Sequence, residues 1–552
     1  MTQKHIYAKL TEALVGYGVS HLFGMRLYPE LDPSQITPVP AHHESSAALM
    51  AYSYARVSGK PGVMTLHRAA TSNAMTGLAE AWQSSVPVIV LNDGVPRANE
   101  GRNALYAQDQ IGLFTPVTKW IADVDDPENA PAMLAKAFQV ATTGRPGPVV
   151  VNLRGAATTP SPSQMVSSSA IFDHNYSSYP ANRISPNMDS IAEAASLLIS
   201  AERPCIVAGG GVILSRAWDD LLELAEIGQF PVATTISGKG GFPERHRLSL
   251  GPTGNVVGGR LGRARIADKM VKDSDVVLII GSRTNEMATS SWEVPSPQST
   301  IIHIDVDPQE IGRNYKTKIG IVGDAKLSIK ALTAALRNHN FEPLSDRTNE
   351  IDSLLKEWET DNFDSMTSDQ IPVHPARIMQ DIQPFIDAGS ILVSDASNPF
   401  MWAASHSFVD AGVNFITPRG TGAIGSGLSL AIGAKIAAPH RNVICFEGDG
   451  GLLCGNLTEL ELAARLNIPI VVVLFNNGSF LLEKERMQNS AIVEANNFLD
   501  LNYADVAKSL GCGGIRVDQP AMLEPAISEA LASGVPTLID VVCEPDIVFP
   551  SR

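Results

Sequence analysis

The sequence has few of the features that mark secreted, zinc-binding or membrane proteins. Its five cysteines form no CxxC pair and no cluster with histidines at zinc-ligand spacing, which excludes a disulfide framework and a zinc finger. Cys205, Cys445 and Cys543 stand in apolar runs and are predicted to be buried thiols. The longest apolar runs, such as 468–475, are one strand long, whereas a membrane span needs about 20 residues. The first residues lack the apolar core of a secretory signal, so we expect a cytoplasmic protein without membrane contact.

Positive charge is also scarce. Against 58 Asp and Glu the chain has 42 Lys and Arg, which gives a net charge of −16 at pH 7. A nucleic-acid surface needs clustered Lys and Arg to neutralise phosphates, and no such run is present. Nucleic acid is therefore not an expected partner. With 44% hydrophobic and 18% charged residues, the composition is that of an ordinary globular protein.

Two polar stretches divide the chain into thirds. Its 552 residues suffice for about three domains of ~150–200 residues each. The stretch 157–186 is rich in serine and proline, and the stretch 338–372 is acidic and contains the helix-like run LLKEWE. We predict domains over residues 1–160, 186–340 and 370–552.

Each third alternates short apolar strands with amphipathic helical stretches. The clearest strands read VPVIVLN, GPVVVNL, PCIVAGG, DVVLIIG, STIIHIDVD, NVICFEGDG, IPIVVVLFNN and PTLIDVV. Seven of these eight are apolar with little interruption, which is typical of parallel strands covered by helices on both faces. The predicted fold class is α/β, with three doubly wound parallel-sheet domains.

The strongest functional signal lies in the last third. An apolar run ends in Gly448, Asp449, Gly450 and Gly451, and a long helical stretch follows. Glycines let backbone N–H groups approach a diphosphate, and a helix N-terminus attracts its charge. A carboxylate there would repel phosphate unless a cation lay between them, so Asp449 predicts a hard metal, Mg2+. Asn477 at the end of the next apolar run offers a second oxygen, and the carbonyl of Ser479 a third.

These two strand ends together resemble the thiamine-diphosphate-dependent enzymes, the group of acetolactate synthase, benzoylformate decarboxylase and pyruvate decarboxylase. The family motif is GDG, a spacer, then NN. Asp449 and Asn477 are 28 positions apart, one more than usual, which indicates an insertion near 452–455. Either turn alone could be an ordinary turn, but each closes an apolar strand.

The resemblance implies further cofactor contacts in the same third. The segment 420–427 matches the family's Gly-rich segment, where Gly422 would contact the cofactor and Ile424 would prop it in a bent shape. Read alone, this segment is also a helix start with a core isoleucine. Ser397 and Asn398, in the loop after the strand ILVS, match a loop that contacts the diphosphate in relatives.

The first third resembles the family's N-terminal signature in Ala41-His42-His43-Glu44 and the helical run that follows. Relatives carry a glutamate where Glu44 stands. The cofactor's own 4′-imino group must remove the C2 proton, and a carboxyl group bonded to the pyrimidine N1′ favours that imino form. Glu44 is therefore predicted to be catalytic and cofactor-binding. The alternative is a helix cap.

The resemblance extends from about residue 5 to about residue 545 and assigns the thirds. They would be a pyrimidine-binding domain, a central Rossmann-like domain and a diphosphate-binding domain, with active sites between the subunits of a homodimer or homotetramer. In the central third, PCIVAGGGVILS lacks a full GxGxxG. The run IIHIDVDPQEIGRN resembles acetolactate synthases that hold FAD and also relatives that hold nothing, so FAD is an alternative that we do not favour.

Two residues bear on the reaction. His67 matches the catalytic histidine of benzoylformate decarboxylase and can pass protons near neutral pH. Glu483 follows Asn477 at the offset of the catalytic glutamate of pyruvate decarboxylases. Each also has a non-catalytic interpretation. His67 could be a structural histidine at a strand end, and Glu483 could be an exposed helix residue. The residues predicted to line the substrate pocket are Tyr28, Tyr106 and Gln108.

The reaction predicted from these residues is decarboxylation of a 2-oxo acid, with or without carboligation. The alternatives are an acetolactate-synthase-like carboligase and a lyase that cleaves acyloins or diketones. An NAD(P)-dependent oxidoreductase would leave Glu44, Asp449 and Asn477 unexplained, and a catalytically silent paralogue would be expected to have lost them. Small molecules are the expected substrates in each case.

Overall fold

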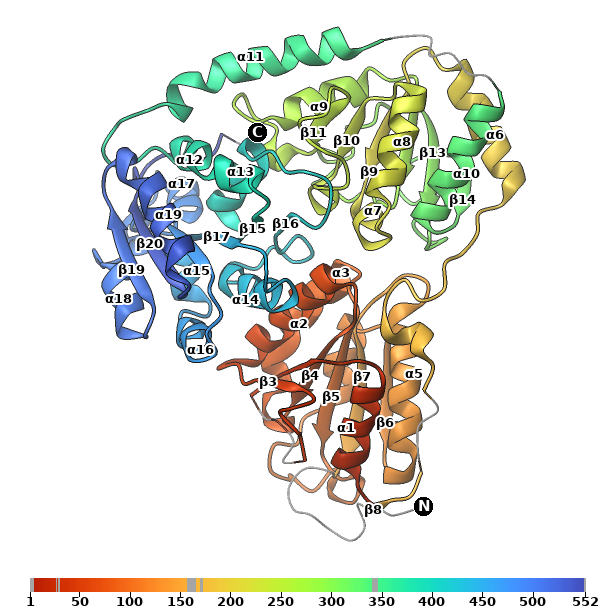
Figure 1. The fold of residues 1–552 in the computed structure, drawn as a ribbon, viewed down its shortest axis with the longest axis vertical. Helices are drawn as coiled ribbons and strands as arrows, with labels where there is room; N and C mark the ends of the chain where they lie inside the picture. Colours follow the sequence, from red (N-terminus) through yellow and green to blue (C-terminus); the bar gives the residue numbers. More distant parts are fainter. Residues whose placement is uncertain are drawn as a thin grey trace. The chain divides into compact units, whose positions relative to one another are not determined.

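The computed structural model describes residues 4–25, 27, 30–155, 165–168, 172–339 and 346–550. Within these residues the chain forms three six-stranded parallel sheets among helices (Figure 1). A short antiparallel pair joins β1 (Lys4–His5) to β8 (Met165–Val166). The predicted fold class, α/β with three parallel-sheet domains, is confirmed.

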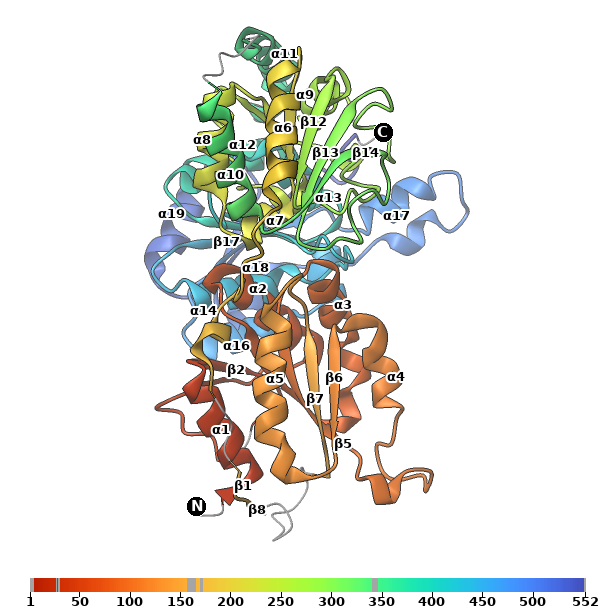
Figure 2. The same ribbon diagram turned by 90° about the vertical axis from the view of Figure 1, so that its right-hand side faces the viewer.

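The N-terminal sheet has the strand order β3-β2-β4-β5-β7-β6. Its strands are β2 (His21–Phe23), β3 (Thr37–Val39), β4 (Gly62–Leu66), β5 (Val88–Gly94), β6 (Trp120–Val124) and β7 (Val149–Arg154). Helices α1 (Ile6–Gly16) and α5 (Ala130–Thr142) share one apolar core with it, and α5 lies beside β7 (Figure 2). Helix α2 (Glu44–Ser58) packs against β4 and β5 and against α3 (Met75–Gln83). Every residue of β5 is buried, as expected for a strand covered on both faces.

The central sheet has the order β11-β10-β9-β12-β13-β14. Its strands are β9 (Cys205–Ala208), β10 (Val232–Thr234), β11 (Ser249–Pro252), β12 (Val276–Ile280), β13 (Thr300–Asp305) and β14 (Thr317–Val322). Helices α6 (Met188–Ser200), α8 (Trp218–Gly228) and α10 (Ala325–Asn338) share one apolar cluster with it. Helices α9 (Ala264–Lys272) and α11 (Thr348–Met366) belong to a second cluster. The helix predicted within 338–372 is α11, which is longer than the run LLKEWE.

The C-terminal sheet has the order β16-β15-β17-β18-β20-β19. Its strands are β15 (Ile391–Ser394), β16 (Phe415–Ile416), β17 (Val443–Gly448), β18 (Val471–Asn476), β19 (Gly513–Val517) and β20 (Thr537–Val542). Helices α12 (Pro375–Asp387), α13 (Ser397–His406) and α19 (Leu523–Ser533) share its main apolar core. Because β15, β17 and β18 are neighbours, the loops that follow them emerge at one edge of the sheet.

All eight strands predicted from apolar runs are confirmed. Cys205, Cys445 and Cys543 are buried as predicted. Within the described part of the chain no helix is both long and apolar enough to cross a membrane.

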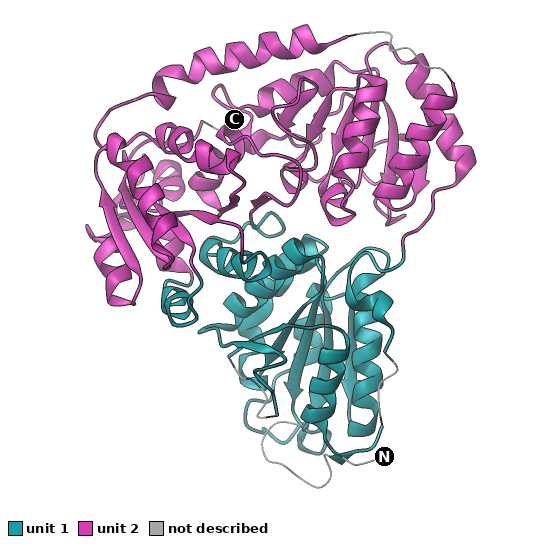
Figure 3. Ribbon diagram, viewed as in Figure 1, with its two compact units in different colours: residues 1–182, 418–439, 456–468 teal, residues 183–417, 440–455, 469–552 magenta. Residues whose placement is uncertain are grey.

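Contacts group the chain into two compact units (Figure 3). One comprises Met1–Asn182, Pro418–Pro439 and Asn456–Ile468, and the remainder forms the other. Helix α14 (Gly427–Ala437) therefore packs with the N-terminal sheet, lying against α2. Each compact unit thus contains segments that are far apart in the sequence. The three predicted domain boundaries stay a prediction.

The core beside the C-terminal sheet buries an imidazole. His406 on α13 is 2% exposed and lies among the rings of Trp358, Trp402 and Phe549. Its Nε2 lies 3.1 Å from Oδ1 of Asn362. Burial lowers the pKa of His406 to about 3, and nearby Arg263 acts in the same direction. The folded protein therefore keeps this histidine neutral where an unfolded chain would protonate it.

Acid should destabilise the fold through His406. Because the pKa is lower in the folded protein than the ordinary 6.5, stability is fully present above pH 6.5 and falls as pH drops towards about 3. The loss from one such group is at most about 1.4 kcal/mol per pH unit. Urea unfolding across this window should show a shallower pH slope for His406→Gln than for wild type, and an unchanged slope for the control His174→Gln. Equal slopes in wild type and His406→Gln would contradict the assignment.

Candidate active site

A buried carboxylate marks the edge of the C-terminal sheet. Asp449, the first residue of α15 (Asp449–Cys454), is 1% exposed. It accepts N–H groups from Gly450 at 2.7 Å, Asn477 at 3.1 Å and Gly478 at 2.6 Å. Burial raises the pKa of Asp449 to about 6, and nearby Asp540 adds to that shift. A carboxylate in this environment is stabilised by a bound cation.

Neutral oxygens lie beside this carboxylate. The side-chain N–H of Asn477 donates to the carbonyl oxygen of Ser479 at 3.2 Å and to its Oγ at 2.9 Å, which leaves Oδ1 of Asn477 for a cation. In the described part of the chain, no group of three or more His, Cys, Asp and Glu is placed to hold a metal. A metal here would depend on one carboxylate with amide and carbonyl oxygens, a donor set that suits Mg2+. The residues present therefore fit the predicted cation.

The glycines of this turn allow close packing of the loops around it. A Cβ at Gly450 would lie 2.7 Å from the ring of Phe480, and a Cβ at Gly448 would lie 3.2 Å from Pro399. Gly451 is buried inside α15.

The prediction of a long helix after this turn is wrong. Helix α15 spans only six residues and ends at Cys454, and α16 (Glu459–Arg465) is a separate short helix. A six-residue helix has a weak dipole, so attraction for a diphosphate at this turn would come chiefly from a metal.

The loop after β15 contains a strained residue. Ser397 has a φ of 69°, in the left-handed region that side chains other than glycine rarely adopt. Such residues cluster at functional sites. The side chain of Asn398 bonds to the C-terminal segment instead. Its Oδ1 accepts the N–H of Phe549 at 2.8 Å, and its Nδ2 donates to the carbonyl oxygen of Ile547 at 3.2 Å. Ser397 is thus the better placed of these two predicted cofactor contacts.

The unit that contains the N-terminal sheet holds the second group of predicted residues. Glu44, the first residue of α2, is 4% exposed. Its Oε2 accepts a hydrogen bond from Nδ2 of Asn73 at 3.1 Å. The cap of α2 is His43, whose side chain accepts the N–H of Ser45. Since His43 already caps the helix, the alternative interpretation of Glu44 as a helix cap loses its main support.

A second carboxylate fixes the turn before Glu44. Glu459 on α16 has a fully buried side chain and accepts the N–H groups of His42 at 2.9 Å and His43 at 3.3 Å. Neither Glu459 nor Asn73 was predicted from the sequence. A lone glutamate on a helix offers no local signal that it binds a turn more than 400 residues away.

His67 lies in a cluster of predicted pocket residues at the end of β4. Its Nε2 is 3.8 Å from Oδ2 of Asp93, and its ring meets that of Tyr106 edge-on at 5.5 Å between centroids. Nε2 of Gln108 reaches the carbonyl oxygen of Ala69 at 3.5 Å. The structure thus brings His67, Tyr106 and Gln108 to one turn. Asp93, near the carboxyl end of the buried strand β5, is not among the residues predicted from the sequence, although a buried acid at the end of an apolar strand is a recognisable signal.

Other predicted residues are less decisive. Ile424 is 36% exposed and lies between Gly422 and Gly425, whose φ angles of 68° and 79° are left-handed. Glu483 on α17 (Leu481–Arg486) has a 46% exposed side chain and pairs with Arg486 at 2.6 Å, as an ordinary helix pair would. Tyr28 lies outside the described residues. The roles of these three stay predictions.

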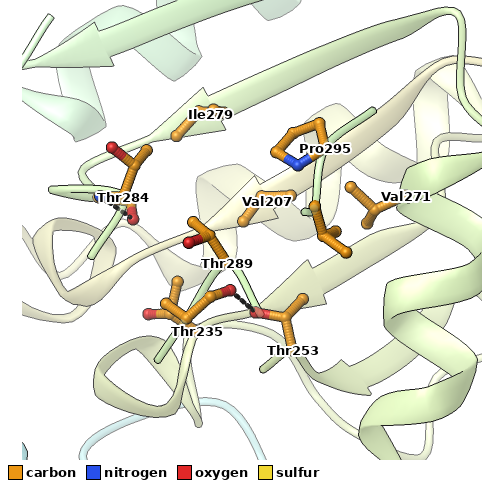
Figure 4. Close-up of a pocket in the computed structure, with 11 residues that line it drawn as sticks. Val207, Thr235, Thr253, Val271, Ile279, Thr284, Thr289 and Pro295 are labelled. Atoms are coloured by element: carbon orange, nitrogen blue, oxygen red, sulfur yellow. Dashed lines mark hydrogen bonds between the residues drawn. The ribbon is translucent and has the colours of Figure 1, made fainter. Parts of the chain in front are cut away.

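The central sheet contains a small cavity at the carboxyl ends of β9 to β12. Hydroxyl groups contribute much of its lining: Thr235, Thr253, Ser282, Thr284 and Thr289 (Figure 4). The glycine turn after β9 packs on backbone, since a Cβ at Gly209 would lie 2.2 Å from the carbonyl oxygen of Gly281. These glycines serve packing in this structure. FAD in this domain stays an unfavoured prediction.

Comparison with known proteins covers the same three regions. Residues 5–113 match the family model of the N-terminal TPP binding domain of thiamine pyrophosphate enzymes. Residues 191–332 match their central domain, and residues 395–541 match their C-terminal TPP binding domain.

Several relatives match along the whole chain. The "Probable acetolactate synthase large subunit" of Methanocaldococcus jannaschii is 33% identical over 98% of this chain and 92% of that protein. Its namesake in Methanococcus aeolicus is 32% identical over 98% and 91%. The "Acetolactate synthase isozyme 3 large subunit" of Escherichia coli is 28% identical over 95% and 91%. The chain therefore belongs to the thiamine-diphosphate-dependent enzymes, and its domains imply thiamine diphosphate as the cofactor.

Proposed function

We propose that the protein is a carboligase of the acetolactate-synthase type that uses thiamine diphosphate and Mg2+. It would join the two-carbon unit left by a decarboxylated 2-oxo acid to the carbonyl of a second 2-oxo acid. The observation that carries this proposal is the 33% identity to an acetolactate synthase relative over 98% of the chain. The simple decarboxylase predicted from His67 and Glu483 becomes the second candidate.

Each half of the site has a role in this proposal. Thiamine diphosphate, when bound, supplies the carbanion-stabilising centre that lets a 2-oxo acid lose CO2. Asp449, Asn477 and the carbonyl of Ser479 would hold Mg2+ and, through it, the diphosphate. Glu44, held by Asn73, would share a proton with the pyrimidine N1′. Ile424 would keep the cofactor bent.

The second candidate rests on proton supply. After CO2 leaves, the two-carbon unit reacts with either a proton or a second carbonyl. A decarboxylase must place an acid near the reacting carbon, whereas a carboligase benefits when acids stay away. His67, whose Nε2 lies 3.8 Å from Oδ2 of Asp93 and whose ring meets that of Tyr106 edge-on, is such an acid candidate. Glu483 is a weaker one, since its carboxylate is bound to Arg486.

Product analysis separates the two reactions. With thiamine diphosphate, Mg2+ and pyruvate, we expect acetolactate as the main product and acetaldehyde as a minor one. If His67 supplies the proton for the minor route, His67→Ala should lower the aldehyde-to-acetolactate ratio by about tenfold or more. NMR of the products together with CO2 release measures both. The exposed control His174→Ala should leave the ratio unchanged.

The opposite outcome has a clear meaning. If wild type forms aldehyde alone at saturating pyruvate, the carboligase proposal is wrong and the decarboxylase takes its place. A lyase would instead cleave added acyloin or diketone faster than it consumes 2-oxo acid.

We also propose a homodimer or homotetramer. The reason is the family resemblance, which implies active sites formed between subunits. A cytoplasmic location stays a prediction of the sequence.

A further inference from the structure

A buried carboxylate on α3 binds the loop that leads to Ile424. Glu80 is 1% exposed. Its Oε1 accepts the N–H of Gly420 at 2.9 Å, and its Oε2 accepts the N–H of Thr421 at 2.8 Å and the hydroxyl of the same residue at 3.1 Å. The hydroxyl of Ser84 donates to Oε1 at 2.6 Å. Glu80 therefore clamps two consecutive peptide groups that are 340 residues away in the sequence.

The loop is pressed onto α3 at this point. A Cβ at Gly420 would lie 2.7 Å from Cβ of Gln83 and 2.8 Å from the carbonyl oxygen of Glu80, so only glycine fits there. Arg419 is partly buried beside the clamp, and a Cβ at Gly422 would lie 3.1 Å from its Nη2. Burial lowers the pKa of the Arg419 guanidinium, and the Glu80 carboxylate opposes that shift. Charge and shape both hold the loop from its first residues up to Gly422.

The clamp stabilises a segment that would otherwise be adaptable. Gly420, Gly422 and Gly425 lose more backbone freedom than other residues when they become ordered, and two of them adopt left-handed angles. Hydrogen bonds from backbone N–H groups to a buried carboxylate are among the strong ones. A loop held in its binding conformation before the ligand arrives binds more tightly, because the ordering is already complete.

We propose that Glu80 is a positioning residue for thiamine diphosphate, which presents Gly422 and Ile424 to the cofactor by fixing the peptide groups of Gly420 and Thr421. The inference rests on the proposed assignment of Gly422 and Ile424 to the cofactor. Glu80 itself touches neither cofactor nor substrate in this scheme.

The variant Glu80→Gln tests the clamp. The amide keeps the shape, but its nitrogen faces a backbone N–H, so one hydrogen bond is lost. We expect the affinity for thiamine diphosphate, measured by calorimetry with Mg2+ present, to fall about tenfold or more. At saturating cofactor, C2–H exchange of the bound cofactor should slow, because Ile424 is no longer held. Circular dichroism should show the same secondary structure as wild type.

The chain offers a matched control in Glu128. Its Oε1 and Oε2 accept the N–H groups of Ser167 and Ser168, each at 2.8 Å, and the hydroxyl of Ser167 adds a third hydrogen bond at 3.0 Å. Glu128→Gln therefore breaks the same kind of clamp at a different loop. It should leave the cofactor affinity and the C2–H exchange rate at their wild-type values. An equal loss in both variants would show that Glu80 acts only through general stability and would overturn the proposal.

A second measurement needs no variant. Hydrogen–deuterium exchange of the cofactor-free wild type should show protected N–H groups at Gly420 and Thr421. Exchange at the rate of an open loop would overturn the proposal, even if Glu80→Gln fails to fold. Ile424→Ala distinguishes the role of Glu80 from the role of the loop. If Ile424→Ala slows C2–H exchange while Glu80→Gln does not, only the positioning role of Glu80 is wrong. If neither does, the assignment of the whole loop is wrong.

Discussion

Replacing Glu44 with glutamine should lower kcat by about 10²–10⁴-fold and leave the fold intact. The two side chains have the same shape, and α2 does not depend on Glu44 for its cap, because His43 supplies it. What the amide cannot do is share a proton with the pyrimidine N1′. The hydrogen bond from Asn73 orients the carboxylate, proton sharing being the role we propose for Glu44, and in the variant the same bond can orient the amide.

Exchange of the C2 proton on the bound cofactor is the direct measurement for Glu44→Gln. It reports cofactor activation without any contribution from the substrate, and it should slow in parallel with kcat. Glu350→Gln is a suitable control, because Glu350 also lies in the first turn of a helix and pairs with Arg203 and Arg347. That control should change stability alone. A wild-type exchange rate in Glu44→Gln would leave Glu44 as a structural residue of α2.

The sequence was informative about strands that are covered on both faces. None of the eight strands predicted from apolar runs is an edge strand; all lie inside their sheets. The edges are short or mixed in pattern. β16 has two residues, and β14 alternates buried and exposed positions. An edge strand has one neighbour and a partly solvated face, so its sequence needs less apolar character and resembles that of a loop.

The long helix predicted after Gly451 failed for a tertiary reason. The run from Leu452 to Leu466 has helical periodicity, but Gly455 adopts a ψ of −121°, far from helical values. The side chain of Asn456 then bonds to the carbonyl oxygen of Gly425 and to Oγ of Ser429. These partners are distant in the sequence, and local pattern cannot reveal them.

The same distinction applies to the site. That Asp449 and Asn477 lie together could be predicted because each directly follows an apolar strand, and parallel neighbours such as β17 and β18 end at one edge. Glu80 and Glu459 could not, since each is a single glutamate on a helix whose partners are peptide groups elsewhere in the chain. A polar residue directly after an apolar strand is recognisable in the sequence. A single glutamate on a helix that binds a distant loop is not.

Replacing Asp449 with alanine should lower the affinity for thiamine diphosphate by at least about 100-fold, since even residues that only support a metal ligand typically contribute 10–100-fold to metal binding. The variant also leaves three backbone N–H groups, those of Gly450, Asn477 and Gly478, without the carboxylate that accepts them. Asp449→Asn separates charge from shape, because it keeps an acceptor oxygen but removes the negative charge that Mg2+ requires. Its affinity should fall nearly as far.

Calorimetry with thiamine diphosphate at increasing Mg2+ concentrations measures this loss. In wild type the affinity should rise with Mg2+, and in both variants that dependence should flatten. Asp268→Asn is the control: Asp268 is a buried aspartate beside the central sheet that accepts the N–H of Gly254 at 3.1 Å and a hydroxyl from Ser290. It should lower stability and keep the Mg2+ dependence. If Asp449→Ala bound the cofactor as tightly as wild type, the diphosphate would have to be held elsewhere, and Asn477 and Ser479 would lose their proposed roles with it.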